Sequence, residues 1–148
     1  MADRQSLEAE LSVLDDVASR YELAQDFDIH QVRFFGEWLL PRVRGTSCLE
    51  VGCGDGSMSE ILVDAVARLD IVDASTKYLR QVEAKLGTRV TLHQAFFESF
   101  EPLQRYETIV CAHVLEHVLD PCDVLARMRE WLAPHGRLFV LVPNALSF

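Results

Sequence analysis

Three glycines spaced one residue apart, Gly52, Gly54 and Gly56, follow a short apolar run that ends in the acid Glu50. Glycine tolerates a positive φ and lets a ligand approach the backbone without meeting a Cβ. After Ser57 the pattern becomes helical, and the first turn of a helix has free N–H groups that point back at such a turn. This stretch therefore predicts a strand, a tight ligand-binding turn and the start of a helix.

A second chemically capable segment contains His113, Glu116 and His117, which spell the H-x-x-E-H signature of some zinc peptidases. On a helix, the two histidines would share one face and hold zinc, with Glu116 as the base. The context counts against zinc hydrolysis, because the segment follows a buried strand and Pro121 begins a new helix four residues after His117. We therefore keep the zinc hydrolase as the weaker alternative.

The elements that must position these residues alternate along the chain. Strands are predicted over 47–51, 68–73, 89–93, 107–112 and 137–142, and helices over 6–24, 30–40, 56–66, 75–86 and 122–132, the last ended by Pro134-His135-Gly136. This order predicts an α/β fold: a doubly wound, Rossmann-like parallel sheet of five strands with helices on both faces. We expect residues 1–45 to form an N-terminal helical cap and residues 46–148 to form the ligand-binding domain.

In such a sheet, ligands bind at the carboxyl ends of the strands. The informative residues of the sequence follow predicted strands and therefore fall at that edge. They are the segment 50–56, Asp73, the segment 94–97 and the segment 113–117. The sequence thus predicts one site built from several loops.

Composition limits the classes of partner. The chain has 148 residues and a formal net charge of −9, so a nucleic-acid backbone is not expected as its main partner. Its apolar runs are too short to cross a membrane, and its N-terminus lacks the pattern of a secretory signal. The cysteines, which form no C-x-x-C pair, are expected to be reduced thiols in a cytoplasmic protein: Cys48, Cys53, Cys111 and Cys122.

The spacing of the glycines argues against a nicotinamide dinucleotide. The dinucleotide motif G-x-G-x-x-G would place its third glycine at Ser57, but the third glycine arrives one residue earlier, at Gly56. Two acids, Glu50 and Asp55, would also lie beside a pyrophosphate. A cationic ligand tolerates both acids better than an anionic one does.

Four segments in order resemble the class I S-adenosylmethionine-dependent methyltransferase family. Residues 50–56 resemble its first motif, and Val72-Asp73-Ala74-Ser75 looks like its second-strand signature. Residues 109–118 and 136–144 resemble its fourth-strand and fifth-strand signatures. The resemblance extends over about two thirds of the chain and implies that the cofactor is S-adenosyl-L-methionine.

The resemblance implies a role for each matching residue. The backbone of Gly52, Cys53 and Gly54 would lie against the methionine and ribose parts of the cofactor. Asp73, next to Ala74, would accept hydrogen bonds from both ribose hydroxyls, the alternative being a solvated loop acid. Glu50 would orient the turn and face the ammonium group of the cofactor.

The resemblance is weaker at the adenine and methionine ends of the cofactor. The family usually has an acid just after the third strand, where this sequence has Phe96. Phe96 or Phe97 would then stack on adenine, or both belong to the core. Arg33, which precedes the first strand, is a candidate partner for the methionine carboxylate.

The function implied is transfer of a methyl group to an oxygen or nitrogen of a small molecule. His113 and His117 are candidates for the base that removes the acceptor proton, although loop histidines also hydrogen-bond backbone or line a cofactor pocket. An alternative is a binding protein without turnover. The family's sheet has seven strands, so we expect either a truncated form of a longer enzyme or self-association through the edge of the fifth strand.

Overall fold

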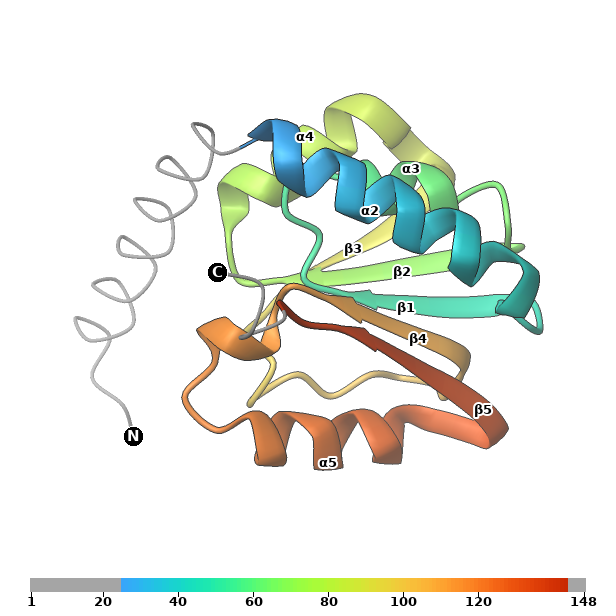
Figure 1. Cartoon of the computed structure of the whole chain (residues 1–148). Coiled ribbons are helices and arrows are strands. Elements are labelled where there is room, and N and C mark those ends of the chain that lie inside the picture. The colour runs from blue at the N-terminus through green and yellow to red at the C-terminus, as the bar shows by residue number, and fades with distance from the viewer. Residues whose placement is uncertain (1–24, 144–148) are drawn as a thin grey trace.

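The computed structural model describes residues 25–143, so the helix predicted over 6–24 lies outside the described residues (Figure 1). One sheet of parallel strands runs in the order β3-β2-β1-β4-β5. The strands are β1 (Ser47–Val51), β2 (Arg68–Asp73), β3 (Val90–Gln94), β4 (Tyr106–Ala112) and β5 (Leu132–Leu141). The predicted doubly wound α/β fold is confirmed.

Helices cover both faces of this sheet (Figure 1). One face carries α2 (Gln25–Leu39), α3 (Ser57–Leu62) and α4 (Thr76–Leu86), and the other carries α5 (Pro121–Trp131). Short 3-10 turns lie at η1 (Leu40–Arg42), η2 (Gly87–Arg89) and η3 (Leu115–His117). The side chain of Ser75 caps α4, and that of Asp120 caps α5 by accepting from two backbone N–H groups at 3.0 Å.

The core consists of two apolar clusters separated by the sheet. Alternate side chains of β1 enter opposite clusters: Cys48 packs on the α2–α4 side, and Leu49 and Val51 pack on the α5 side. Because β1 lies in the middle of the sheet, both of its faces are buried. This burial fixes the carboxyl end of β1, from which the glycine turn starts.

Several predicted boundaries were wrong, most clearly around β5. The triplet Pro134-His135-Gly136 does not end the helix, because α5 ends at Trp131 and β5 begins at Leu132. Tyr106 pairs with Leu132 and Thr108 with Arg137, so residues 133–136 bulge opposite Glu107 alone. A bulge breaks the alternation that would have marked the strand. Helix α3 is also shorter than predicted, and α2 begins earlier.

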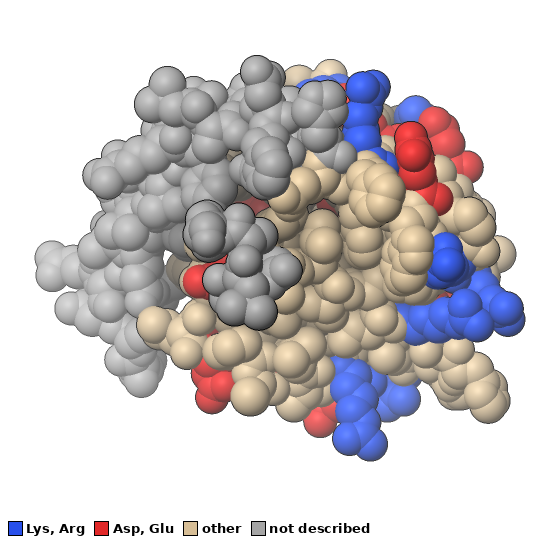
Figure 2. Space-filling view, in the orientation of Figure 1, with Lys and Arg blue, Asp and Glu red and all other residues tan. Residues whose placement is uncertain are grey.

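An apolar surface surrounds the edge strand β5. Trp38 of α2 meets Phe139 of β5 edge to face, with ring centroids 6.2 Å apart. Exposed side chains nearby include Phe34 on α2 and Val140 on β5, which are 75% and 38% exposed. Figure 2 shows mostly uncharged residues in the middle of this view, with Lys and Arg around them toward its upper, right and lower sides. Among the described helices, none is long and apolar enough to cross a membrane.

Candidate active site at the carboxyl edge of the sheet

The candidate site starts at the turn between β1 and α3, where the backbone is left-handed at each glycine. The angle φ is +75° at Gly52, +50° at Gly54 and +87° at Gly56. The N–H of Gly52 donates to the carbonyl of Val72 at 2.8 Å, and that of Gly56 donates to the carbonyl of Cys53 at 2.9 Å. Side chains with a Cβ disfavour these angles, so the turn requires its glycines.

The space around the glycines differs from one to the next. A Cβ built on Gly52 would overlap Cγ2 of Val114, and one built on Gly56 would lie 3.0 Å from Val82. At Gly54, no atom of the described residues beyond its chain neighbours would come within 4 Å. The open room for a ligand therefore lies at Gly54.

Asp73, at the end of β2, holds the glycine turn from the neighbouring strand. Its Oδ2 accepts from the N–H of Cys53 at 2.9 Å, and its Oδ1 accepts from the N–H of Ser75 at 2.8 Å. Burial raises the pKa of Asp73, and these N–H donors oppose the rise. The thiol of Cys53 also donates to Oδ2, at 3.5 Å, so the turn itself occupies most of the roughly four acceptor positions of this carboxylate.

Glu50, at the end of β1, is 1% exposed. Its Oε2 accepts a hydrogen bond from Oγ of Ser59 at 2.6 Å, whereas Oε1 is buried and has no hydrogen-bond partner within the described part of the chain. Burial raises the pKa of Glu50 to about 8, the Ser59 hydrogen bond opposes the rise, and Asp73 and Asp55 add to it. A buried acceptor without a partner is costly unless it is protonated or meets a ligand.

Asp55 shapes the outer side of the turn. Its carboxylate accepts from the backbone N–H of Ser57 at 3.0 Å and from the Ser57 hydroxyl at 2.8 Å. Its carbonyl accepts from Nζ of Lys85 on α4 at 2.8 Å. Side chains of the turn itself and of α4 thus fix the loop in place before any ligand binds.

The loop after β4 brings His113 to the same edge. This residue has a left-handed backbone, with φ of +55°, and its N–H donates to the carbonyl of Leu141 at 2.9 Å. Its Nδ1 lies 3.5 Å from Oε1 of Glu116, and its Nε2 is buried without a hydrogen-bond partner among the described residues. Left-handed residues other than glycine cluster at functional sites.

The H-x-x-E-H segment is not an α-helix in this structure. His113 lies in the left-handed region, and His117 ends the 3-10 turn η3, with its N–H donating to the carbonyl of Val114. The α-helical spacing on which the zinc signature depends is therefore missing. Within residues 25–143, no group of three or more His, Cys, Asp or Glu side chains could hold a metal ion.

The remaining predicted site residues lie at different distances from the turn. The ring of Phe97 is half-buried against the cluster on the α5 side, and its Cζ would lie 3.7 Å from a Cβ on Gly52. Phe96 is also half-buried, and Ala74 is buried beside Asp73. Arg33 is exposed on α2. Phe97 thus lies next to the glycine turn, and the roles of Phe96, Ala74 and Arg33 stay predictions.

The cysteines show no sign of nucleophilic activation. All four are free thiols, and Cys48, Cys53 and Cys111 are buried. Burial raises the pKa of the Cys53 thiol, and the nearby charges of Asp73 and Glu50 add to the rise. Since the thiolate is the nucleophile, the Cys53 sulfur is not activated for attack, and its thiol instead donates a hydrogen bond to Oδ2 of Asp73.

Three residues of the site were missed in the sequence. They are Ser59, which donates to Glu50; Val114, which lies over Gly52; and Lys85, which donates to the loop carbonyl of Asp55. The position of Ser59 in the first turn of the helix that follows the glycine turn was its signal in the sequence. No sequence signal pointed to Lys85, because its contact with the Asp55 carbonyl, 30 residues away, depends on how α4 packs.

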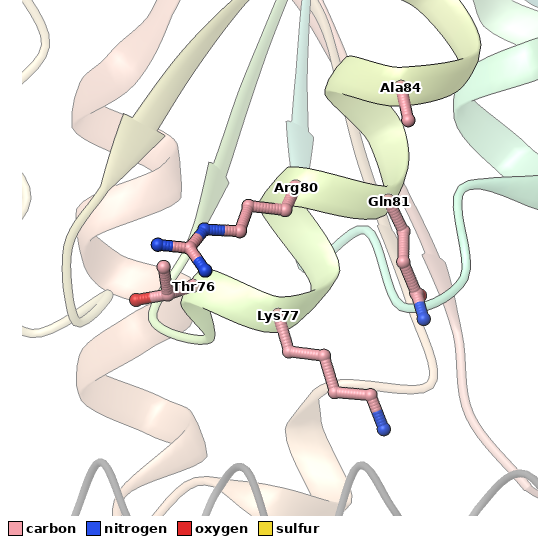
Figure 3. A pocket seen from close by; sticks show the side chains of 5 residues that line it. All are labelled: Thr76, Lys77, Arg80, Gln81 and Ala84. Atoms are coloured by element: carbon pink, nitrogen blue, oxygen red, sulfur yellow. The ribbon is translucent and has the colours of Figure 1, made fainter.

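An open pocket of about 560 Å³ lies on the outer face of α4, separate from the glycine turn. Five α4 residues line it, and Figure 3 shows the side chains of Lys77 and Arg80 extending away from the helix. Thr76, at its N-terminal end, accepts a hydrogen bond from Nε2 of Gln94 at 2.7 Å. Through Thr76 the pocket adjoins the end of β3.

A family described as a methyltransferase domain matches residues 20–147. The chain belongs to this family. The ubiquinone biosynthesis O-methyltransferase of Aromatoleum aromaticum is 31% identical over 105 residues, which cover 68% of this chain and 45% of that protein. The protein of the same name from Vibrio vulnificus is 29% identical over 146 residues, covering 91% and 62%.

A solved methyltransferase has the same fold. The N-methyltransferase NodS from Bradyrhizobium japonicum, in complex with S-adenosyl-L-homocysteine, aligns with a TM-score of 0.72 and 23% identity, covering 92% of this chain and 70% of that one. The chain spans about half the length of the first curated relatives it matches.

Proposed function

We propose that this chain binds S-adenosyl-L-methionine at the glycine turn and transfers its methyl group to an oxygen or nitrogen of a small molecule. The observation that carries the proposal is the open space at Gly54, next to Cys53, which interacts with the acidic side chains of Asp73 and Glu50. A sulfonium cofactor with an ammonium group and ribose hydroxyls fits acids at this position, as an anionic pyrophosphate does not.

The chemistry is an in-line displacement at the methyl carbon. The bond from methyl carbon to sulfur breaks as the bond to the acceptor forms, and the electron pair of the broken bond stays on sulfur. The sulfonium is already a good leaving group, so the chain chiefly supplies proximity and orientation.

We propose His113 as the base that takes the acceptor's proton. Its Nε2 is buried without a described hydrogen-bond partner, and its Nδ1 faces Glu116 at 3.5 Å. His117 is the second candidate. Changing His113 to Gln should lower turnover far more than donor affinity, and the same change at His117 should have the smaller effect.

Binding without turnover is the second candidate function. The chain spans about half the length of its first curated relatives, so the matched part of those proteins need not contain the residues that bind their acceptor. Incubation with methyl-labelled donor and a panel of phenols and amines distinguishes the two. Labelled product from any acceptor supports the enzyme, whereas donor binding with no labelled product supports the binding protein.

Matched glycine variants test the cofactor site by calorimetric titration with S-adenosylmethionine and S-adenosylhomocysteine. Gly54 and Gly87 have similar φ, +50° and +56°, and both have open space where a Cβ would lie. Gly54→Ala should weaken binding at least tenfold, because its methyl group enters the ligand space. Gly87→Ala, at the end of α4, also places a methyl group at a positive φ (with ψ of −132° there) and should bind normally. Equal affinities in the two variants would contradict the proposed site.

We also propose that two copies of the chain associate through β5. This strand pairs only with β4, so one of its edges is open in the described residues, and apolar side chains flank it. Val140→Lys should turn a dimer into a monomer in light scattering. Leu103→Lys, at an exposed residue outside the sheet, should leave the dimer intact. A monomeric unmodified chain would contradict this proposal.

A further inference from the structure

The buried pair of Glu50 and Ser59 lies beneath the glycine turn, where β1 meets the start of α3. Ser59 is 0% exposed and Glu50 is 1% exposed, and the hydroxyl of the first donates to Oε2 of the second at 2.6 Å. The other oxygen, Oε1, is enclosed but has no hydrogen-bond partner in the described residues. Oε2 therefore has a hydrogen-bond partner within the described residues, whereas Oε1 is available to another group.

The groups that face Glu50 are mostly acidic or neutral. Asp73 from β2 and Asp55 from the turn act on it as like charges, and the buried thiols of Cys48 and Cys53 are close enough to interact with it. The nearest described cation of the turn, Lys85, is engaged with the carbonyl of Asp55 and lies 3.5 Å from Glu60. No described cation balances a charge on Glu50.

We propose that Glu50, held by Ser59, gives up a proton when the positively charged methyl donor binds, and so makes the site prefer the donor over its neutral-sulfur product. The inference rests on the proposed function. The proton goes to solvent, the carboxylate remains, and no covalent bond other than O–H changes. Glu50 acts as a specificity-determining residue, and Ser59 is the positioning residue that keeps Oε1 available.

The physical basis is the cost of a buried charge. A carboxylate without a counter-charge is strongly disfavoured in the interior, so Glu50 is protonated in the free protein at neutral pH, in agreement with its pKa of about 8. A ligand that brings one more positive charge close to Glu50 supplies that counter-charge. Donor and product share the ammonium, the carboxylate and the ribose, and they differ in charge only at sulfur.

Calorimetric titration in buffers of different ionisation enthalpy counts the protons released, and comparing donor with product cancels the shared amino group. At pH 7 the donor should release at least half a proton more than the product. Between pH 6 and about 7.5, the ratio of product Kd to donor Kd should rise by up to tenfold per pH unit, because protons compete with the donor.

Variants assign the effect to these two residues. Glu50→Gln should abolish the extra proton and flatten the pH dependence of the Kd ratio. Ser59→Ala removes a hydrogen bond that favours the carboxylate, so the same transition should move to higher pH. Asp70→Asn, which alters another acid that is 1% exposed but lies on β2 outside the site, should keep the wild-type behaviour.

The outcomes separate the inference from the proposal on which it rests. If neither donor nor product binds, the proposed function fails. If both bind and release equal numbers of protons at every pH, the inference about Glu50 is wrong and the proposed function stands. The unmodified chain alone decides this, so the test does not depend on a variant that folds.

Discussion

Gly52→Ala is expected to be the most destabilising of the single alanine substitutions in the glycine turn. Two separate effects act at this residue. Its φ of +75° is unfavourable for any side chain, and a Cβ would overlap Cγ2 of Val114. Gly54→Ala shares only the first effect, because the space there is open.

The magnitude follows from these two effects. Placing alanine in a left-handed conformation costs about 1 to 2 kcal/mol. Forcing a methyl group into a packed contact costs a further ~1 to 3 kcal/mol, which gives a loss of about 2 to 5 kcal/mol for Gly52→Ala. Gly54→Ala should lose only about 1 to 2 kcal/mol.

A double-mutant cycle with Val114→Ala separates the effects. This change removes the overlapping methyl groups at a cost of about 1.5 kcal/mol. The double variant should therefore lose about 1 to 3 kcal/mol less than the sum of the single changes. Urea unfolding, followed by the fluorescence of buried Trp131, measures all four proteins. Additive losses, or equal losses for Gly52→Ala and Gly54→Ala, would refute the contact between the turn and the loop after β4.

Three further predictions concern stability. Burial raises the pKa of Asp70, but hydrogen bonds from Arg68 and Tyr106 outweigh burial and lower the pKa overall. The ionised Asp70 should therefore stabilise the fold fully above its ordinary pKa of about 3.9, and this stabilisation should disappear as the pH falls below that value. Asp70→Asn should reduce the fall of the urea midpoint at acidic pH. The pKa of Glu50 is shifted in the opposite direction, up to about 8. The folded state should therefore lose stability as the pH rises from about 4.3 to 8, and Glu50→Gln should remove that decline in thermal melts. Asp120→Ala removes the cap of α5 and should cost about 1 kcal/mol in urea unfolding, and a loss below a quarter of that would contradict the cap seen here.

Much of the fold could be predicted from local sequence patterns. The alternation of apolar runs and helical segments predicted five parallel strands in a doubly wound sheet, and Gly52, Gly54 and Gly56 marked the turn because only glycine accepts its backbone angles. Asp73 was identifiable because it ends a predicted strand and matches the family's second-strand signature. The predicted start of β5 was wrong, because a bulge opposite Glu107 interrupts the alternating strand pattern there.

The order of residues along the chain thus determined the fold class, the position of the candidate site at the carboxyl edge of the sheet, and the acids found there. Tertiary structure alone decided which neighbours those acids have. Ser59 reaches Glu50 because α3 packs against β1, Lys85 reaches the turn from α4, and Val114 covers Gly52 from the loop after β4. Such contacts join distant parts of the chain, and their electrostatic effect depends on burial, which no local pattern specifies. The raised pKa of Glu50 is therefore a property of the folded molecule.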